Sequence, residues 1–231
     1  MLDALKLLTE SDSNFTKQFT ANNLLICHLG QQSYLDTLQA MQQYANGRSN
    51  HPDQIWLLQH PETYTKGRLS NQSDIKHALP HPLIDTDRGG KITYHGPGQL
   101  ICYLLLHMPE TQSIRWLTQR IDDIVLTILH QLAIEGMSDP KHRGIYAGER
   151  KIASVGVRIR KKCSYHGFSL NVDMDLSPFE VIKPCGREQK MTQTTQLNSN
   201  ADMSQVIQIC EKTISSLWKK EKNIVIYDFE S

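Results

Sequence analysis

The chain has 231 residues, with 25 Lys and Arg against 24 Asp and Glu and a formal net charge of +1. This length fits one large domain or two small ones, and the balanced charge does not indicate a nucleic acid or an anionic membrane as partner. No stretch approaches the ~18 apolar residues of a membrane span, and the N-terminus lacks a signal-peptide pattern. We therefore expect a cytoplasmic protein that binds neither nucleic acid nor membrane.

The five cysteines are far apart and form no C-x-x-C pair, so the sequence indicates neither a zinc ribbon nor a redox dithiol. They are Cys27, Cys102, Cys163, Cys185 and Cys210. Cys163 and His166 could form half of a metal site, but no second half follows nearby. We expect no metal, and most of these thiols should be small buried side chains.

Helices are predicted where apolar residues recur at intervals of three and four, and strands where they alternate or form short runs. In chain order we expect a strand at 23–28, a helix at 33–45, strands at 55–60, 151–160 and 164–172, helices at 113–135 and 203–219, and a last strand at 223–229. The long helix should stop at Gly136. Several strands follow one another without room for crossover helices, which predicts an α+β fold with a mixed or antiparallel sheet flanked by helices. We expect a single domain over residues 1–231, with residues 1–20 poorly ordered.

The segment RGGKITYHGPGQL at 88–100 carries four glycines around one titratable side chain, His95. Glycine lets the backbone approach a ligand more closely than a Cβ would permit, so main-chain amides could contact a substrate here. Two tight turns would explain the same residues. The spacing alone leaves both interpretations open.

Alternation in KIASVGVRIR at 151–160 puts Lys151 on one strand face with Ala153, Val155 and Val157. A lysine at the head of an apolar face can be a snorkelling side chain. It can also be a partly desolvated ammonium that faces a cavity and pairs with an anion or transfers protons.

The strand YHGFSLNV at 165–172 alternates in the same way, with Tyr165, Gly167 and Ser169 opposite His166 and Phe168. Gly167 leaves room for a close neighbour.

Cys185 lies between Pro184 and Gly186 in IKPCG, where a rigid turn could expose the sulfur beside a free backbone N–H. A buried structural thiol is the alternative. Together with Lys151 and the glycine-flanked His95, however, Cys185 completes a set of nucleophile, cation and oxyanion donors. Acidic residues are scattered and no pair indicates a hydrolase.

Five segments resemble the lipoyl(octanoyl) transferases, in that family's order and from about Leu24 to Leu197. They are HPETYTKG at 60–67, RGGKITYHGPGQL at 88–100, GERKIASVGVRI at 148–159, YHGFSLNV at 165–172 and IKPCG at 182–186. The resemblance implies the fold shared with biotin and lipoate protein ligases. It also implies transfer of an octanoyl group from octanoyl-acyl carrier protein to a lysine of lipoyl domains, those of 2-oxoacid dehydrogenases and of the glycine cleavage H protein.

By the same resemblance, Cys185 matches the acyl-accepting nucleophile and Lys151 its catalytic partner. The positions that match the substrate-binding residues are Arg88, Gly89, Gly90, Lys91, Ile92, Thr93, Tyr94, His95, Ser154, Val155, Gly156, Gly167, Phe168 and Ser169. Two positions depart from the family pattern: Lys66 replaces a usually apolar residue, and Lys183 adds a positive charge near Cys185.

The expected reaction needs no cofactor, because a thioester is already activated, and we expect a monomer. Two other functions stay open. An ATP-dependent lipoate or octanoate ligase of the same fold would form an acyl-adenylate and would not need Cys185. A non-catalytic acyl-binding module would form no covalent adduct.

A basic run surrounds the expected hairpin turn, with Arg158, Arg160, Lys161 and Lys162 close together. It could steer an acidic carrier protein toward the site. It could equally be a solvated edge that discourages pairing with other strands.

Overall fold

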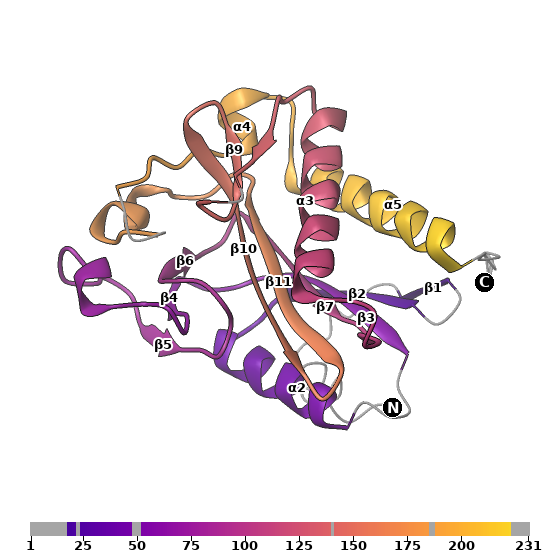
Figure 1. The fold of residues 1–231 in the computed structure, drawn as a ribbon. Coiled ribbons are helices and arrows are strands. Elements are labelled where there is room, and N and C mark those ends of the chain that lie inside the picture. Colours follow the sequence, from indigo (N-terminus) through magenta and orange to yellow (C-terminus); the bar gives the residue numbers. More distant parts are fainter. Residues whose placement is uncertain (1–17, 22–23, 48–51, 140, 185–187, 223–231) are drawn as a thin grey trace.

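The computed structural model describes residues 18–21, 24–47, 52–139, 141–184 and 188–222. These residues form an eight-stranded sheet, in the order β1-β2-β3-β7-β11-β10-β9-β8, and a three-stranded sheet, in the order β5-β4-β6 (Figure 1). The strands are β1 Gln18–Ala21, β2 Leu24–Gln31, β3 Asp53–Gln59, β4 Thr63–Lys66, β5 Leu83–Asp85, β6 Thr93–His95, β7 Gln99–Leu105, β8 Met137–Ser138, β9 Ile145–Ala147, β10 Arg150–Arg160 and β11 Cys163–Asn171. The helices are α2 Tyr34–Asn46, α3 Ile114–Gln131, α4 Thr194–Leu197 and α5 Met203–Lys222, with short 3-10 helices η2 Gln72–Asp74 and η3 Ser177–Val181.

Both sheets are mixed. Strands β2 and β3 pair in parallel, and the other pairs of the large sheet are antiparallel. In the small sheet β4 pairs in parallel with β5 and antiparallel with β6. The α+β class with a mixed sheet flanked by helices is therefore confirmed.

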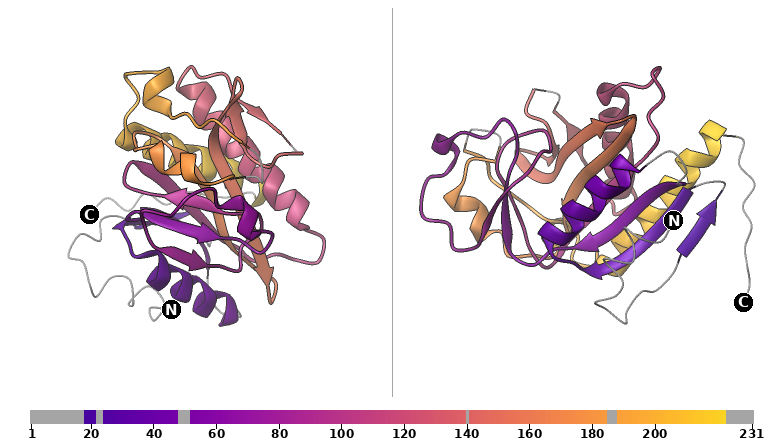
Figure 2. Two further views of the ribbon diagram at one scale, coloured as in Figure 1. Left: turned by 90° about the vertical axis from the view of Figure 1, so that its left-hand side faces the viewer. Right: turned by 90° about the horizontal axis from the view of Figure 1, so that it is seen from below.

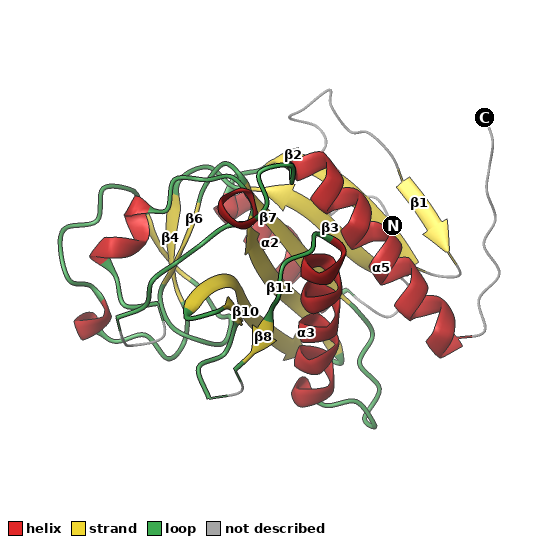
Figure 3. Ribbon diagram, turned by 90° about the horizontal axis from the view of Figure 1, so that it is seen from above, coloured by secondary structure: helices red, strands yellow, loops and turns green. Residues whose placement is uncertain are grey.

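The large sheet is the middle of three layers (Figures 1 and 3). Helices α3 and α5 pack side by side on one face, where Leu117, Ile121 and Ile214 meet Leu104 and Leu170 of the sheet in one buried cluster. Helix α2 covers the opposite face in a second cluster. Because both faces are covered, the central strand β7 is buried along its whole length.

The three-stranded sheet lies beside the large one and packs against η3 (Figure 2). Its buried cluster includes Tyr64, Tyr94 and Phe179. None of the helices in the described ranges combines the length and the apolar character that crossing a bilayer requires.

The long β10–β11 hairpin turns at Lys161 and Lys162, whose φ angles are 49° and 59°. A two-residue hairpin turn that matches the right-handed twist of its strands needs positive φ angles at both central residues, as seen here. The basic run around this turn is engaged in part, because Arg158 pairs with Asp87 and Lys162 with Glu110.

Two local expectations were wrong. Helix α3 ends at Gln131, before Gly136, because Ala133 takes a φ of 54° and the N–H groups of Ala133 and Ile134 bond back to the carbonyls of His130 and Leu129. These two bonds form a Schellman motif, with alanine where glycine is usual.

The second wrong expectation is the regular alternation of side chains along β10. A bulge between Lys151 and Ala153 interrupts this alternation in the pairing with β9. Ile152 and Ala153 consequently both join the core cluster under α3. Lys151 is therefore not the first residue of a regularly alternating apolar face.

The predicted strand at 223–229 lies outside the described residues. Of the N-terminal residues 1–20, the described ones, 18–20, belong to β1.

Candidate active site

A cavity of about 420 Å³ lies between the glycine-rich segment, the β10–β11 hairpin and residues 141–143. Apolar side chains such as Ile92, Ile101 and Val155 form part of its wall. Fourteen of the predicted site residues line it: Arg88, Gly89, Gly90, Lys91, Ile92, Thr93, His95, Lys151, Ser154, Val155, Gly156, Gly167, Phe168 and Ser169. Segments far apart in sequence thus meet around one space, as the motifs predicted.

Tyr94 does not line this cavity. Successive residues of a strand point to opposite sides, so in β6 the neighbours Thr93 and His95 reach the cavity while Tyr94 points away. Its ring packs 5.2 Å from that of Tyr64 and 5.5 Å from that of Phe179, centroid to centroid. Tyr94 is therefore a core residue of the small sheet.

Lys151 is 3% exposed although its side chain lines the cavity. Its Nζ donates a hydrogen bond to the main-chain oxygen of Arg143 at 2.9 Å. Gly144 makes this contact possible, since a Cβ there would lie 2.3 Å from the Cε of Lys151 and its φ is +151°. The buried amine is thus held by the segment that precedes β9.

The backbone of Lys151 ties the site to the segment that follows Pro184. Its N–H donates to the carbonyl of Lys190, its carbonyl accepts from Thr192, both at 2.9 Å, and it forms a parallel bridge with Met191. Pro184 itself lines the cavity. Cys185, predicted as the nucleophile, lies outside the described residues, and the described segments on either side of it reach Lys151 and the cavity wall.

The other four cysteines, Cys27, Cys102, Cys163 and Cys210, are buried. Burial raises the pKa of the Cys27 thiol to about 12 and that of Cys102 well above its ordinary value. Because the thiolate is the reactive form of cysteine, Cys27 and Cys102 are unsuited to act as nucleophiles.

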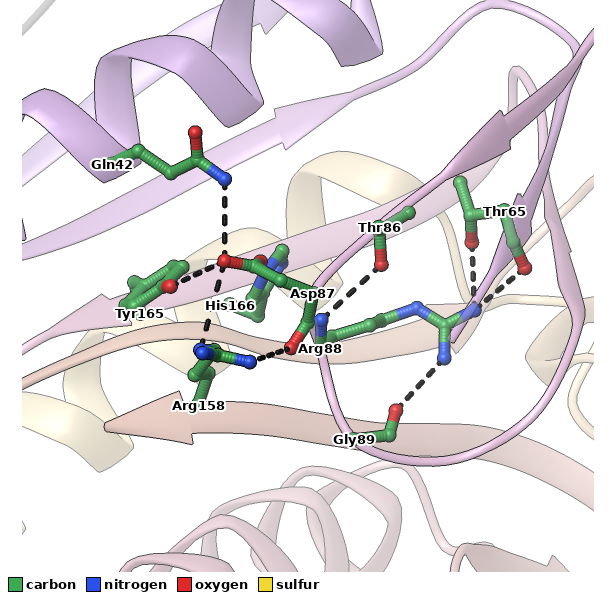
Figure 4. A network of polar contacts seen from close by, with 9 residues as sticks. All are labelled: Gln42, Thr65, Thr86, Asp87, Arg88, Gly89, Arg158, Tyr165 and His166. Carbon is green, nitrogen blue, oxygen red and sulfur yellow. Dashed lines mark hydrogen bonds and ion pairs between the residues drawn. The ribbon is translucent and has the colours of Figure 1, made fainter. Parts of the chain in front are cut away.

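Arg88 holds the glycine-rich segment in place from inside the protein (Figure 4). Its guanidinium donates to the carbonyls of Gly89, Lys91 and Thr65 at 3.0, 2.8 and 2.8 Å, and also to the hydroxyl of Thr65 at 2.8 Å. The N–H of Gly89 donates to the carbonyl of Val157 at 3.1 Å, which attaches the segment to β10. The glycines therefore form one wall of the cavity beside the hairpin.

The hydrogen bonds of His95 fix it as a neutral ring. The amide nitrogen of Gln99 donates to Asn171 at 2.9 Å, so its oxygen accepts from Nδ1 of His95 at 2.7 Å. Nε2 then accepts from the hydroxyl of Thr65 at 3.3 Å. Burial and the neighbouring His60 lower the pKa of His95 well below its ordinary value. Both ring nitrogens of His95 are thus hydrogen-bonded to other residues of the cavity wall. His95 is therefore better suited to positioning the wall than to transferring protons.

Several lining residues have no counterpart among the predicted ones, notably Tyr34, Tyr103, His142, Arg143 and His166. His60 contacts two of them: it accepts from the hydroxyl of Tyr103 at 2.8 Å, and its ring stands 4.9 Å from that of Tyr34. For His166 a signal was present, because it belongs to the YHGF motif. It was missed because the family resemblance matched only Gly167, Phe168 and Ser169 of that strand to substrate-binding positions.

The two departures from the family pattern lie apart from the cavity wall. Lys66 pairs with Asp85 of the neighbouring strand, with 3.5 Å between Nζ and Oδ1, and does not line the cavity. Lys183 donates its N–H to the carbonyl of Asp74 at 2.7 Å.

Comparison with known sequences gives a consistent result. The family model described as the lipoyl protein ligase A/B catalytic domain matches residues 33–215. A protein of Shewanella woodyi named octanoyltransferase is 39% identical over 197 residues, which cover 84% of this chain and 90% of the relative. An octanoyltransferase of Shewanella oneidensis is 44% identical over 165 residues, covering 71% and 76% of the two chains.

Solved structures share the fold at low identity. A putative lipoate protein ligase from T. acidophilum with bound lipoic acid superposes with a TM-score of 0.68 at 16% identity, covering 84% of this chain and 85% of that one. A biotin protein ligase from Aquifex aeolicus gives 0.51 at 15% identity, covering 86% and 71%. The expected biotin and lipoate protein ligase fold is therefore confirmed.

Proposed function

Because the chain belongs to the lipoyl protein ligase A/B catalytic-domain family, we propose that it is an octanoyltransferase of lipoate biosynthesis. It takes the octanoyl group from an octanoyl-acyl carrier protein and passes it to a lysine of a lipoyl domain, in 2-oxoacid dehydrogenases and in the glycine cleavage H protein. The observation that carries this proposal is the buried amine of Lys151 in a partly apolar cavity, beside the segment that contains Cys185.

In the first half-reaction the sulfur of Cys185 attacks the thioester carbonyl of the carrier. A bond forms between this sulfur and the acyl carbon, and the bond from the acyl carbon to the pantetheine sulfur breaks. The positive charge of Lys151 favours the thiolate form of Cys185, and the Lys151 ammonium gives a proton to the departing pantetheine thiolate. The octanoyl group is then held as a thioester on Cys185.

In the second half-reaction the neutral amine of the acceptor lysine attacks the same carbonyl. An amide bond forms, the bond to the Cys185 sulfur breaks, and Lys151, neutral after the first step, takes the amine proton, which restores the ammonium beside the Cys185 thiolate. Main-chain N–H groups of the glycine-rich segment and the hairpin are the candidate donors to the oxyanion that forms in both steps. The enzyme returns to its starting state without a nucleotide or a metal.

The four other cysteines support the choice of nucleophile. All are buried, and the pKa of Cys27 and of Cys102 is raised by burial. The neutral histidine His95 supports the choice of Lys151 for proton transfer, because the ring nitrogens of His95 already bond Gln99 and Thr65.

An ATP-dependent ligase is the second candidate, because solved lipoate ligases share this fold, including a lipoate-protein ligase A bound with ATP at a TM-score of 0.67 and 17% identity. The octanoyltransferases are more similar in sequence, at 39% and 44% identity. Transfer of free octanoate that depends on ATP would favour the ligase.

Intact-protein mass spectrometry after mixing with octanoyl-acyl carrier protein tests the proposal. We expect one octanoyl adduct, labile to hydroxylamine, that maps to Cys185 and disappears in Cys185→Ser. Cys163→Ser is the control and should be acylated normally. An active enzyme without an adduct, or an adduct on Cys102 or Cys163, would refute the assignment.

We further propose that the enzyme works in the cytoplasm as a monomer. Size-exclusion chromatography with light scattering tests the second point, since a dimer would elute with twice the chain mass.

A further inference from the structure

Residues 74–76, at the end of η2, pair with residues 181–183, which come just before the cavity-lining Pro184. The pairing has an antiparallel bridge at its centre. At one end of it the N–H of Lys183 donates to the main-chain oxygen of Asp74 at 2.7 Å. The chain that leads to Pro184 is therefore held against a segment that lies far from it in the sequence.

The side chain of Asp74 joins this pairing to the glycine-rich segment. Its Oδ1 and Oδ2 lie 2.9 and 3.2 Å from Nζ of Lys91, and Oδ2 also accepts from the N–H of Asn71 at 2.8 Å. The Asp74 side chain is 3% exposed, so its charge depends on these donors. Lys91 lines the cavity and is partly exposed. One buried carboxylate thus connects two parts of the cavity wall.

A second contact of the same segment reaches the chain on the other side of Cys185. Nζ of Lys76 donates to Oε2 of Glu188 at 2.9 Å, and this hydrogen bond lowers the pKa of Glu188. The Glu188 side chain is largely exposed, and ion pairs of this kind contribute little to stability. Residues 74–76 therefore contact the chain before and after Cys185, and Asp74 makes the buried contact that reaches the cavity wall.

We propose that Asp74 is a positioning residue for acyl transfer. Through Lys91 and the residues before Pro184, it sets the separation between the glycine-rich wall and the segment that carries Cys185. The inference rests on the proposed octanoyl transfer, in which the thioester carbonyl must lie within reach of the Cys185 sulfur and of the main-chain donors of that wall. Asp74 does not line the cavity, so it acts through its neighbours. A misplacement of about 1 Å in such a site can slow a reaction about 100-fold.

Asp74→Asn removes the carboxylate with little change of shape. One of its two terminal atoms becomes a donor, so the side chain can no longer accept from both Lys91 and Asn71. With saturating octanoyl-acyl carrier protein, the rate constant for adduct formation on Cys185 should fall by about 10-fold or more. The final yield of adduct should stay that of the wild type.

Substitutions of Lys91 test the same contact from the other side. Lys91→Met should slow adduct formation as Asp74→Asn does, whereas Lys91→Arg keeps the charge and can donate to both carboxylate oxygens, so it should lose far less. Lys66→Met is the matched control. It breaks the ion pair with Asp85 in the small sheet, but Lys66 does not line the cavity.

Time-resolved mass spectrometry of the intact protein separates positioning from loss of folding. A merely structural role would lower the fraction of folded protein and hence the adduct yield, while the folded molecules would react at the wild-type rate. Asp74→Asn combined with Lys91→Met should be no slower than the slower single variant, because both changes remove one pair. Wild-type rate constants in the single variants, or losses that multiply in the double variant, would overturn the inference.

Hydrogen exchange provides a readout that needs no substrate. The amide of Lys183 should exchange faster in Asp74→Asn and Lys91→Met than in the wild type and Lys66→Met. Unchanged exchange would overturn the positioning role. Absence of any adduct on the wild-type protein would refute the proposed function, and exchange would then decide by itself whether Asp74 holds the two segments together. If Asp74→Asn does not fold, Lys91→Met, at a partly exposed position, supplies both readouts.

Discussion

The Nζ of Lys151 and the main-chain oxygen of Arg143 are 2.9 Å apart, so the loop before β9 helps to orient the buried amine. The loop is ordered by Asp139, which accepts from the N–H groups of Lys141 and His142 and from the ring of His142. Its hydrogen bond with His142 lowers the pKa of Asp139 to about 2. The position of the proposed proton carrier therefore depends on residues that do not touch the reacting atoms.

Replacing Lys151 by Ala should slow both acylation and acyl transfer by about 100-fold or more, because the group that moves the proton is lost. Lys151→Arg keeps the positive charge but cannot act as a base, so it should restore acylation more than transfer. Rapid-mixing measurements of each half-reaction distinguish these effects. Rates close to wild type in both steps would mean that Lys151 is a structural residue.

Gly144→Ala should lower kcat by roughly 10- to 100-fold, because the added Cβ would collide with Cε of Lys151 and displace the amine. Gly148→Ala is the matched control: its φ is +59° but nothing lies within 4 Å of the added Cβ. Both substitutions strain the backbone, whereas only the first reaches Lys151. Steady-state kinetics with equal losses in the two variants would contradict this explanation.

The protein should lose stability as the pH falls from about 6.5 to 4. Burial lowers the pKa of His60 to about 4, so over this range the unfolded chain binds a proton that the folded protein does not. Stability therefore rises with pH there, by about 3 kcal/mol for His60 alone.

Thermal unfolding of wild type and His60→Gln between pH 7.5 and 5 measures this effect. A glutamine can donate to the carbonyl of Gln32 and accept from Tyr103, as His60 does, but it does not titrate. The variant should lose less Tm on acidification. Equal losses would assign the pH dependence to other groups.

Ala133→Gly should raise the free energy of unfolding by about 0.5 to 1 kcal/mol. Ala133 is exposed and has a φ of 54°, which a Cβ disfavours and glycine adopts freely. Ala133→Val should be destabilising, because a β-branched side chain fits this conformation poorly. Urea unfolding of the three proteins gives the order, and a less stable glycine variant would contradict the prediction.

The basic hairpin turn should contribute little to carrier binding. Arg160 lies nine residues from Lys151 along β10, roughly 30 Å at about 3.3 Å per residue, and Lys162 pairs with Glu110. The double change Lys161→Glu and Lys162→Glu should leave KM for octanoyl-acyl carrier protein nearly unchanged at low salt. Lys141→Glu, at an exposed position that lines the cavity, should raise it. The reverse result would make the turn the docking surface.

The sequence by itself determined the main elements and most of the candidate site. The apolar spacing predicted α2, α3 and α5, and alternation predicted the β10–β11 hairpin, because these elements have only one way to bury their apolar residues. The motifs predicted that Arg88, Lys151 and Gly156 would meet around one space, and the cavity brings them together. Cys185 stays a prediction, since it lies outside the described residues.

Only the tertiary structure decided the details that depend on the backbone bending away from ideal geometry. The bulge after Lys151 and the positive φ of His166 each interrupt alternation, and periodicity carries no signal for either. The contacts of Asp87 with Gln42, Tyr165 and His166 join α2, β11 and the loop before the glycines. Such contacts form between residues distant in sequence once the layers have packed, so no local pattern could predict which residues Asp87 would join.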